Sequence, residues 1–135
     1  MKRTLLSILS ILACASLLSL GVDSRAQAAC TNASLKGTFG YTCEGTLGGL
    51  LAVEVGIGTY DGAGNVSGKS TLSVSGTAPT AITWTGSYTI NADCTGAVTF
   101  GDGSHAALVL DDHKHELRVI ATDPGTVYTC LKKEQ

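Results

Sequence analysis

The sequence predicts an all-β protein, and the simplest architecture is an antiparallel up-and-down barrel of about eight strands. A glycine-rich unit occurs at 58–68 and again at 86–96, and each copy has the spacing of a β-hairpin. After residue 28 no ten-residue segment has a helical period, and the connections between apolar segments are too short for parallel crossovers. Closure into a barrel removes the exposed sheet edges; a two-sheet β-sandwich is the alternative.

The N-terminal segment predicts export. Lys2 and Arg3 precede an apolar run over 5–22, and Ala26-Gln27-Ala28 matches a small-x-small cleavage site. We therefore expect residues 1–28 to be a signal peptide. Residues 29–135 then form a single β-barrel domain that is secreted or periplasmic and has no membrane span. An uncleaved anchor and a lipoprotein modified at Cys14 are the alternatives.

Alternation of apolar and polar residues predicts the strands of the first half. The expected inward face of strand 35–43 contains Phe39, Tyr41 and Cys43. Strand 51–58 also alternates, but the sequence does not decide which of its faces points inward. The inward faces of strands 66–74 and 82–90 are expected to contain Val66, Leu72, Val74, Ile82, Trp84, Tyr88 and Ile90.

The second half predicts four more strands, separated by Asp- and Gly-rich turns. A short strand contains Val98 and Phe100, and a continuous apolar run follows at 105–110. Such a run is typical of a strand covered on both faces, and the sequence does not decide which face points inward. Alternation returns at 116–122, and the Asp123-Pro124-Gly125 turn leads into the last strand at 126–132.

Charge and cysteine usage limit the partners and the compartment. Residues 29–135 carry six Lys and Arg against ten Asp and Glu, a net charge of −4, which argues against nucleic acid or anionic lipid as a partner. Four cysteines in an exported domain predict two disulfides. Barrel topology favours Cys30–Cys94 and, because closure makes the first and last strands neighbours, Cys43–Cys130. The expected register weakens the second pair, and Cys30–Cys130 competes with it.

Several segments together resemble a group of small secreted bacterial proteins of unknown function. They are 32–40, 61–65, 86–96 and 122–127, and the resemblance covers almost all of residues 29–135. It implies a barrel similar to allene oxide cyclase and dirigent barrels, and more loosely to lipocalins, although Gly37-Thr38-Phe39 replaces the lipocalin Gly-x-Trp signature. It also implies that Cys30 and Cys94 are the common pair and that Cys43 and Cys130 are additional.

Aromatic residues and one carboxylate are the candidate ligand-binding residues. Trp84, Tyr88, Phe39 and Tyr41 could line a cavity for an apolar ligand, although small barrels usually fill their interior with side chains. Glu54 is the one carboxylate within an apolar strand. An inward Glu54 would be a buried acid of the kind that enzymes use, but the favoured interpretation places it outside, where it discourages edge pairing.

The other polar motifs are expected to be turns. His113 and His115 share a strand face, but His105 is predicted to lie opposite Ile120, so only Asp111 or Asp112 could complete a weak metal site. Ser104 and His105 point to opposite faces and so cannot form a nucleophile–base pair. The segment 61–65 resembles calcium and phosphate loops but lacks their further ligands. We expect no catalytic residues, no metal and no cofactor.

These observations favour a non-enzymatic, exported barrel that acts as a structural or interaction module of the cell envelope or extracellular space; a monomer is the simplest state. A carrier of a small apolar ligand is the first alternative. An enzyme of the cyclase or dirigent kind, which guides a reactive intermediate by shape, is the second.

Overall fold

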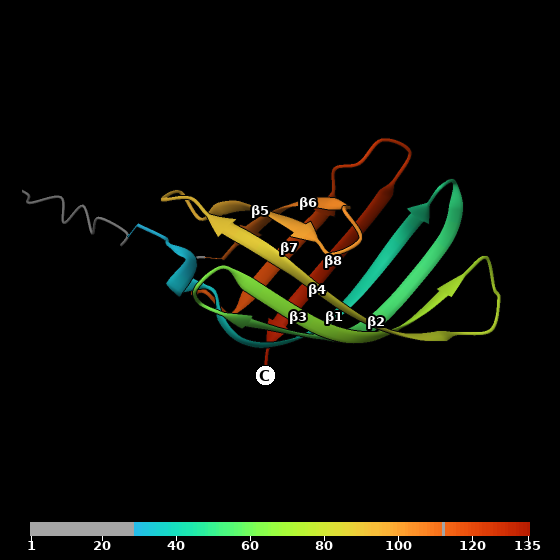
Figure 1. Ribbon diagram of the computed structural model, residues 1–135, viewed down its shortest axis with the longest axis horizontal. Coiled ribbons are helices and arrows are strands. Elements are labelled where there is room, and N and C mark those ends of the chain that lie inside the picture. Colours follow the sequence, from blue (N-terminus) through green and yellow to red (C-terminus); the bar gives the residue numbers. More distant parts are fainter. Residues whose placement is uncertain (1–28, 112) are drawn as a thin grey trace, which may run out of the picture.

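The computed structural model describes residues 29–111 and 113–135, which form a closed antiparallel barrel of eight strands (Figure 1). Each strand pairs with the next in the chain, and β8 pairs with β1. The predicted fold class is confirmed. The elements are η1 (Asn32–Ser34, a 3-10 helix), β1 (Lys36–Leu47), β2 (Leu50–Asp61), β3 (Asn65–Val74), β4 (Thr80–Ile90), β5 (Thr95–Phe100), β6 (His105–Leu110), β7 (Glu116–Ala121) and β8 (Val127–Glu134).

The predicted signal peptide, residues 1–28, and Cys14 lie outside the described residues. Within the described part of the chain, no helix has the length and apolar character needed to cross a membrane.

The barrel wall is much longer on one side than on the other. Strands β1 and β2 have 12 residues each, whereas β5, β6 and β7 have 6 each. At about 3.3 Å per residue, the long strands extend roughly 20 Å further than the short ones. The β1–β2 and β3–β4 hairpins therefore project beyond the rest of the barrel, at the right of Figure 1.

The end of the barrel that holds residue 29 and the C-terminus is closed by η1 and the residues next to it. The Tyr88 hydroxyl donates to the Leu35 carbonyl oxygen over 2.6 Å and accepts from Gly62 N over 2.9 Å. Asn32 Oδ1 accepts from Ile90 N over 2.8 Å. These bonds hold residues 30–35 across the barrel opening, and the Cys30–Cys94 disulfide joins this segment to the β4–β5 turn.

The core lies in this closed half. Phe39 packs edge-on against Tyr60 with ring centroids 5.5 Å apart, and Tyr60 packs in the same way against Tyr88 at 5.3 Å. Leu108, Leu117 and other buried residues of the short strands complete this cluster. Packing of this kind is the usual content of a small barrel.

Both disulfides join the cysteine pairs favoured by the sequence. The Cα atoms are 5.0 Å apart in Cys30–Cys94 and 4.1 Å apart in Cys43–Cys130. The register expected to weaken the second pair was wrong, because β1 continues four residues past Cys43 and β8 continues to Glu134. Both cysteines therefore lie in mid-strand, directly opposite each other.

Two strands differ from the expectation about their faces. In β2 the inward residues are Ala52, Glu54, Gly56, Gly58 and Tyr60, so the favoured outward placement of Glu54 is wrong. The reason is space. A Cβ on Gly56 would lie 2.5 Å from Ser70 Cβ, so the interior has no room for the valines of this strand. In β6 only one face is covered, since Val109 on the other face is 52% exposed.

Trp84 fits against glycines of the neighbouring strands. Gly68 lies opposite Trp84 in the β3–β4 register and opposite Gly58 in the β2–β3 register. A Cβ on Gly68 would lie 2.2 Å from Trp84 Cζ2, and one on Gly58 would lie 3.0 Å from Trp84 Cη2. The absence of side chains here allows the indole to lie against the barrel wall.

We expect Gly68→Ala to lower the free energy of unfolding by about 2 kcal/mol, because the new methyl group would collide with the Trp84 ring and the Ile57 carbonyl oxygen. Urea denaturation followed by the fluorescence of the single tryptophan measures this change. Ser67→Ala, on the exposed face of the same strand, is the control and should change stability by less than about 0.5 kcal/mol. Equal stability of Gly68→Ala and wild type would contradict this packing.

Candidate functional site

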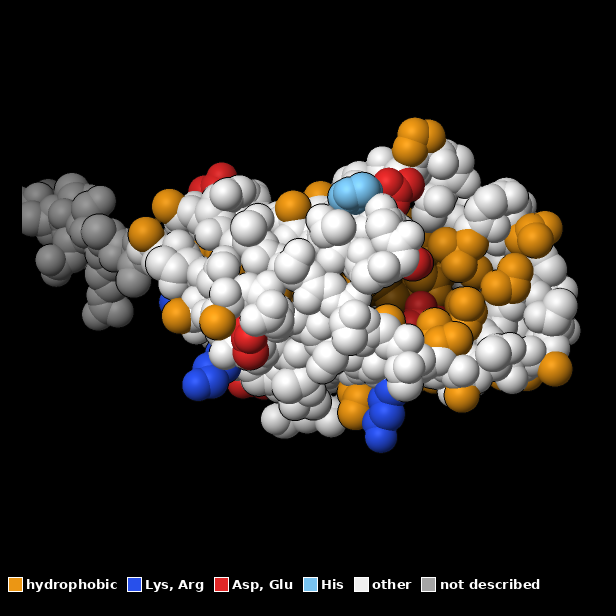
Figure 2. Space-filling view, viewed as in Figure 1, with side chains coloured by type: hydrophobic (Ala, Val, Ile, Leu, Met, Phe, Trp, Pro, Cys, Tyr) orange, Lys and Arg blue, Asp and Glu red, His pale blue; other side chains and the backbone are white. Residues whose placement is uncertain are grey.

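A cavity of about 620 Å³ opens at the end of the barrel opposite η1. Figure 2 shows it as a hollow at the right, with hydrophobic side chains around it and acidic side chains deep inside. It exists because the long strands β1–β4 extend beyond the short strands that face them. The projecting hairpins form one wall, and the β5–β6 and β7–β8 turns form the rim on the other side.

The walls of the cavity are mainly apolar and come from nearly all the strands. Aliphatic and aromatic side chains make up most of this surface, and the Cys43–Cys130 disulfide is part of it. The apolar wall residues are Leu47, Leu72, Ile82, Trp84, Phe100, Ala106, Val119 and Ala121. Such a lining favours an apolar ligand.

The floor of the cavity is a hydrogen-bonded polar group built around Glu54. Tyr41 donates its hydroxyl hydrogen to Glu54 Oε1 over 2.7 Å, and Tyr128 donates to Oε2 over 3.0 Å. Trp84 Nε1 in turn donates to the Tyr41 hydroxyl oxygen over 2.9 Å. Burial raises the pKa of both Tyr41 and Tyr128, and the Glu54 carboxylate raises them further, so both phenols stay protonated as donors.

Lys132 completes the floor and is only 3% exposed. Its Nζ lies 4.5 Å from the ring centroid of Tyr41, 5.1 Å from that of Trp84 and 5.7 Å from that of Tyr60. Among the described residues no carboxylate lies within ion-pair distance of this nitrogen. Burial lowers the pKa of Lys132 from 10.5 to about 8, and the charge of Glu54 partly opposes the shift.

The period of two along each strand brings these groups together. In β8, Tyr128 and Lys132 are each two residues from Cys130, whose disulfide to Cys43 directs this face inward. Neither Tyr128 nor Lys132 was among the ligand-binding residues predicted from the sequence. Counting in steps of two from Cys130 would have placed them inside.

The five residues predicted to bind a ligand fall into two groups. Trp84, Tyr41 and Glu54 line the cavity. Phe39 and Tyr88 do not; they lie in the packed core of the closed half, where Tyr88 anchors the segment that covers that end.

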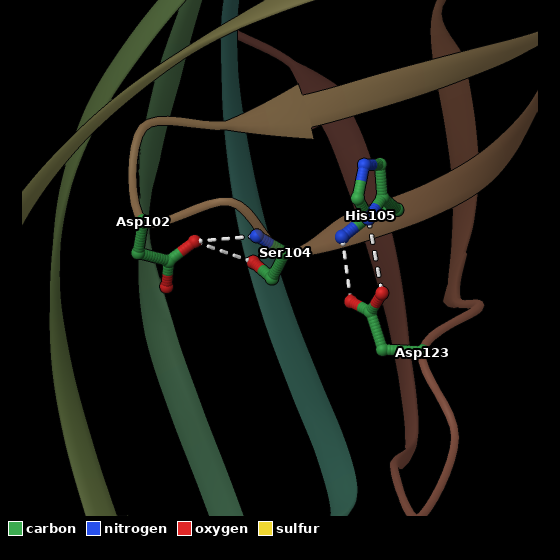
Figure 3. A network of polar contacts seen from close by, with 4 residues as sticks. All are labelled: Asp102, Ser104, His105 and Asp123. Carbon is green, nitrogen blue, oxygen red and sulfur yellow. Dashed lines mark hydrogen bonds and ion pairs between the residues drawn. The ribbon is translucent and has the colours of Figure 1, made fainter.

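Ser104 and His105 belong to two separate polar pairs at the cavity rim (Figure 3). Ser104 Oγ donates to Asp102 Oδ1 over 2.7 Å, and His105 Nδ1 lies 3.0 Å from Asp123 Oδ1. Among the described residues no hydrogen bond joins Ser104 to His105. Both carboxylates also accept backbone N–H groups, so their arrangement is that of capped turns.

The histidines do not converge. The predicted register, with His105 opposite Ile120, is wrong, because Ala107 lies opposite Ile120. Asp111 Oδ1 accepts from the backbone N–H groups of both His115 and Glu116 and so holds a longer turn. The His115 ring pairs with the Glu134 carboxylate. Among the described residues no three His, Cys, Asp or Glu side chains are grouped for a metal ion, and Asp112 lies outside them.

The 61–65 segment is a turn whose acidic residue is occupied by its own backbone. Asp61 Oδ1 accepts hydrogen bonds from the N–H groups of Ala63, Gly64 and Asn65, and Oδ2 accepts from the Asn65 side chain. These bonds lower the pKa of Asp61 to about 2, the Asn65 side chain having the largest effect. Its oxygens are thus engaged in forming the hairpin.

Comparison of the chain with protein-family models, with curated proteins and with solved structures gives no match. The resemblance to small secreted barrels of the allene oxide cyclase and dirigent kind stays a prediction.

The buried floor predicts an unusual dependence of stability on pH. The pKa of Lys132 is lower in the folded than in the unfolded state, so the unfolded chain binds the extra proton and stability rises as pH increases above about 8. The buried tyrosines have raised pKa values, so stability falls once unfolded tyrosines ionise near pH 10.

We therefore expect the free energy of unfolding to increase by about 2 kcal/mol between pH 7 and about pH 9.5 and then to decline. Urea denaturation with the disulfides intact measures it. The increase should be absent in Lys132→Met and retained in Lys133→Met, which removes the adjacent, exposed lysine. The same curve for wild type and Lys132→Met would contradict a depressed pKa at Lys132.

Proposed function

We propose that this protein is an exported binder of small apolar molecules, which enter the open end of the barrel and place a polar group against its floor. The observation that carries the proposal is the cavity itself. Its volume of about 620 Å³ lies within the range of small-molecule sites, and its apolar walls surround a few convergent polar groups.

The composition of the floor favours a neutral ligand. Lys132 and Glu54 carry opposite charges in one buried group, so the floor as a whole is close to neutral. A fully charged ligand would lose its hydration and would find no excess of opposite charge in return. A hydroxyl or carbonyl group can instead exchange hydrogen bonds with the phenols and the amine.

The cysteines agree with a site outside the cytoplasm. Two disulfide-bonded pairs within a small domain are compatible with an oxidising, extracytoplasmic compartment. The expected secreted or periplasmic location is part of this proposal.

A second candidate function is an enzyme of the cyclase or dirigent kind. It is favoured by Glu54, which lines a solvent-reachable cavity, as this hypothesis requires. Chemical analysis of ligands recovered after incubation separates the two, because a binder returns them unchanged. The alternative of a structural or interaction module stays a prediction from the sequence.

The binding proposal predicts that the neutral fluorophore N-phenylnaphthylamine binds residues 29–135, called the mature domain below, with one-to-one stoichiometry and a dissociation constant on the order of micromolar. Fluorescence enhancement measures binding. Ala121→Phe should weaken it about tenfold, because Ala121 lines the cavity and a benzyl group there occupies ligand space.

Ile120→Phe is the matched control. This neighbouring residue is 53% exposed on the outer face, so binding should not change. Absence of binding by the wild-type domain, or equal weakening by both variants, would contradict a ligand site inside the barrel.

A further inference from the structure

Lys132 differs from every other lysine that the structure describes. It lies inside the barrel and lines the cavity, whereas Lys133 is 70% exposed and pairs with Glu116 on the outer surface. Lys36 and Lys69 are exposed on outward strand positions, and Lys114 is part of the β6–β7 turn. Among the described lysines, only Lys132 has an amine that can meet a molecule that enters the cavity.

The surroundings of Lys132 leave its amine available for reaction. Rings of Tyr41, Tyr60 and Trp84 surround Nζ, and no described residue accepts a hydrogen bond from it. The nearby carboxylate of Glu54 is engaged by Tyr41 and Tyr128. A lysine without a hydrogen-bonded partner in an apolar pocket loses its proton readily and then acts as a nucleophile toward carbonyl groups.

From this geometry we propose that Lys132 captures aldehydes that enter the cavity, as Schiff bases on its Nζ. The inference rests on the proposed function, because the aldehyde must first occupy the cavity. Its alkyl or aryl part would contact the apolar walls, and its carbonyl carbon would face the amine.

The reaction needs no oxidant or reductant. The lone pair of neutral Nζ forms a bond to the carbonyl carbon, and the π pair moves to the oxygen, which receives a proton from the nitrogen. The C–O bond of this carbinolamine then breaks, water leaves with the second amine proton, and a C=N bond forms. If the imine is protonated, the Glu54 carboxylate supplies the opposite charge and the aromatic rings stabilise the cation.

The acid–base properties of the floor agree with this chemistry. Four titratable groups face Lys132: Glu54 and Tyr60 from β2, Tyr41 from β1 and Tyr128 from β8. β4 contributes Trp84, and β7 contributes the apolar Leu117 and Val119. With its pKa lowered to about 8, Lys132 is neutral in a substantial fraction of molecules at pH 8. An exposed lysine is neutral about a hundredfold less often.

The test is reductive trapping of cuminaldehyde, a small apolar aldehyde without a conjugated alkene. The mature domain with both disulfides intact is incubated with it at pH 8, treated with cyanoborohydride, digested and mapped by mass spectrometry. Allowing for the lower nucleophilicity of a less basic amine, we expect Lys132 to be labelled about tenfold more than any other lysine.

Labelling at this site should be lost in Lys132→Met and retained in Lys133→Met. The alcohol of the same skeleton, cuminyl alcohol, should protect Lys132 by occupying the cavity. Because peptide mapping compares lysines within the wild-type protein, the result does not depend on whether Lys132→Met folds.

The outcomes separate the two proposals. Selective labelling of Lys132 supports both. If N-phenylnaphthylamine binds and cuminyl alcohol displaces it, but cuminaldehyde labels the exposed lysines equally or labels none, the aldehyde proposal is overturned and the binding proposal stands. If neither the fluorophore nor cuminyl alcohol binds and Lys132 is unlabelled, both proposals fail.

Discussion

Closure of the barrel between β8 and β1 is the constraint on which the rest of the structure depends. Once these strands pair, with Cys43 opposite Cys130, every second residue of each strand must point into one shared interior. Phe39, Tyr60 and Tyr88 fill the interior of the closed end, while aliphatic side chains such as Leu72 and Ile82 line much of the open end. Unequal strand lengths then leave that end open. The cavity is thus a consequence of how the chain distributes volume and length around a closed sheet.

The polar floor is not explained by stability. Burying an ammonium group and a carboxylate removes both from water, and similar buried pairs can often be replaced by apolar residues without loss of stability. Here Lys132 and Glu54 lie too far apart for an ion pair and are held instead by aromatic rings and phenol hydroxyls. The interior of a small barrel can be filled with apolar side chains, as the closed half demonstrates. A buried polar group that does not add to stability, at the base of an open cavity, is better explained by the proposed binding of a ligand there.

The sequence predicted the fold class, the number of strands and the inward faces of β1, β3 and β4, because residues such as Phe39 and Trp84 alternate there with small polar ones. It predicted β2 as a strand but did not predict its inward face, because the more apolar face points outward. The reason is shape, because the β2 face that carries Gly56 and Gly58 is the one that fits beside Ser70 and under the Trp84 ring. Hydrophobicity along a strand reports average burial. The face that fits into the interior is decided by side chains from other strands, and the pattern of a single strand contains no information about them.

The same distinction explains why the polar motifs of the sequence were poor guides to the site. Asp, Ser, His and Gly cluster in the turns, where Asp61 and Asp102 accept backbone N–H groups and fix the hairpins. The hydrogen-bonding capacity of these side chains is thus used within the turns themselves. The groups that converge in the cavity come instead from strands far apart in the chain, with one or two residues from each strand, as with Glu54 and Lys132. No short motif can contain such a set, because a barrel brings it together only after the strands have paired. In a barrel of this kind, the inward polar residues of otherwise apolar strands therefore identify the site better than the turns do.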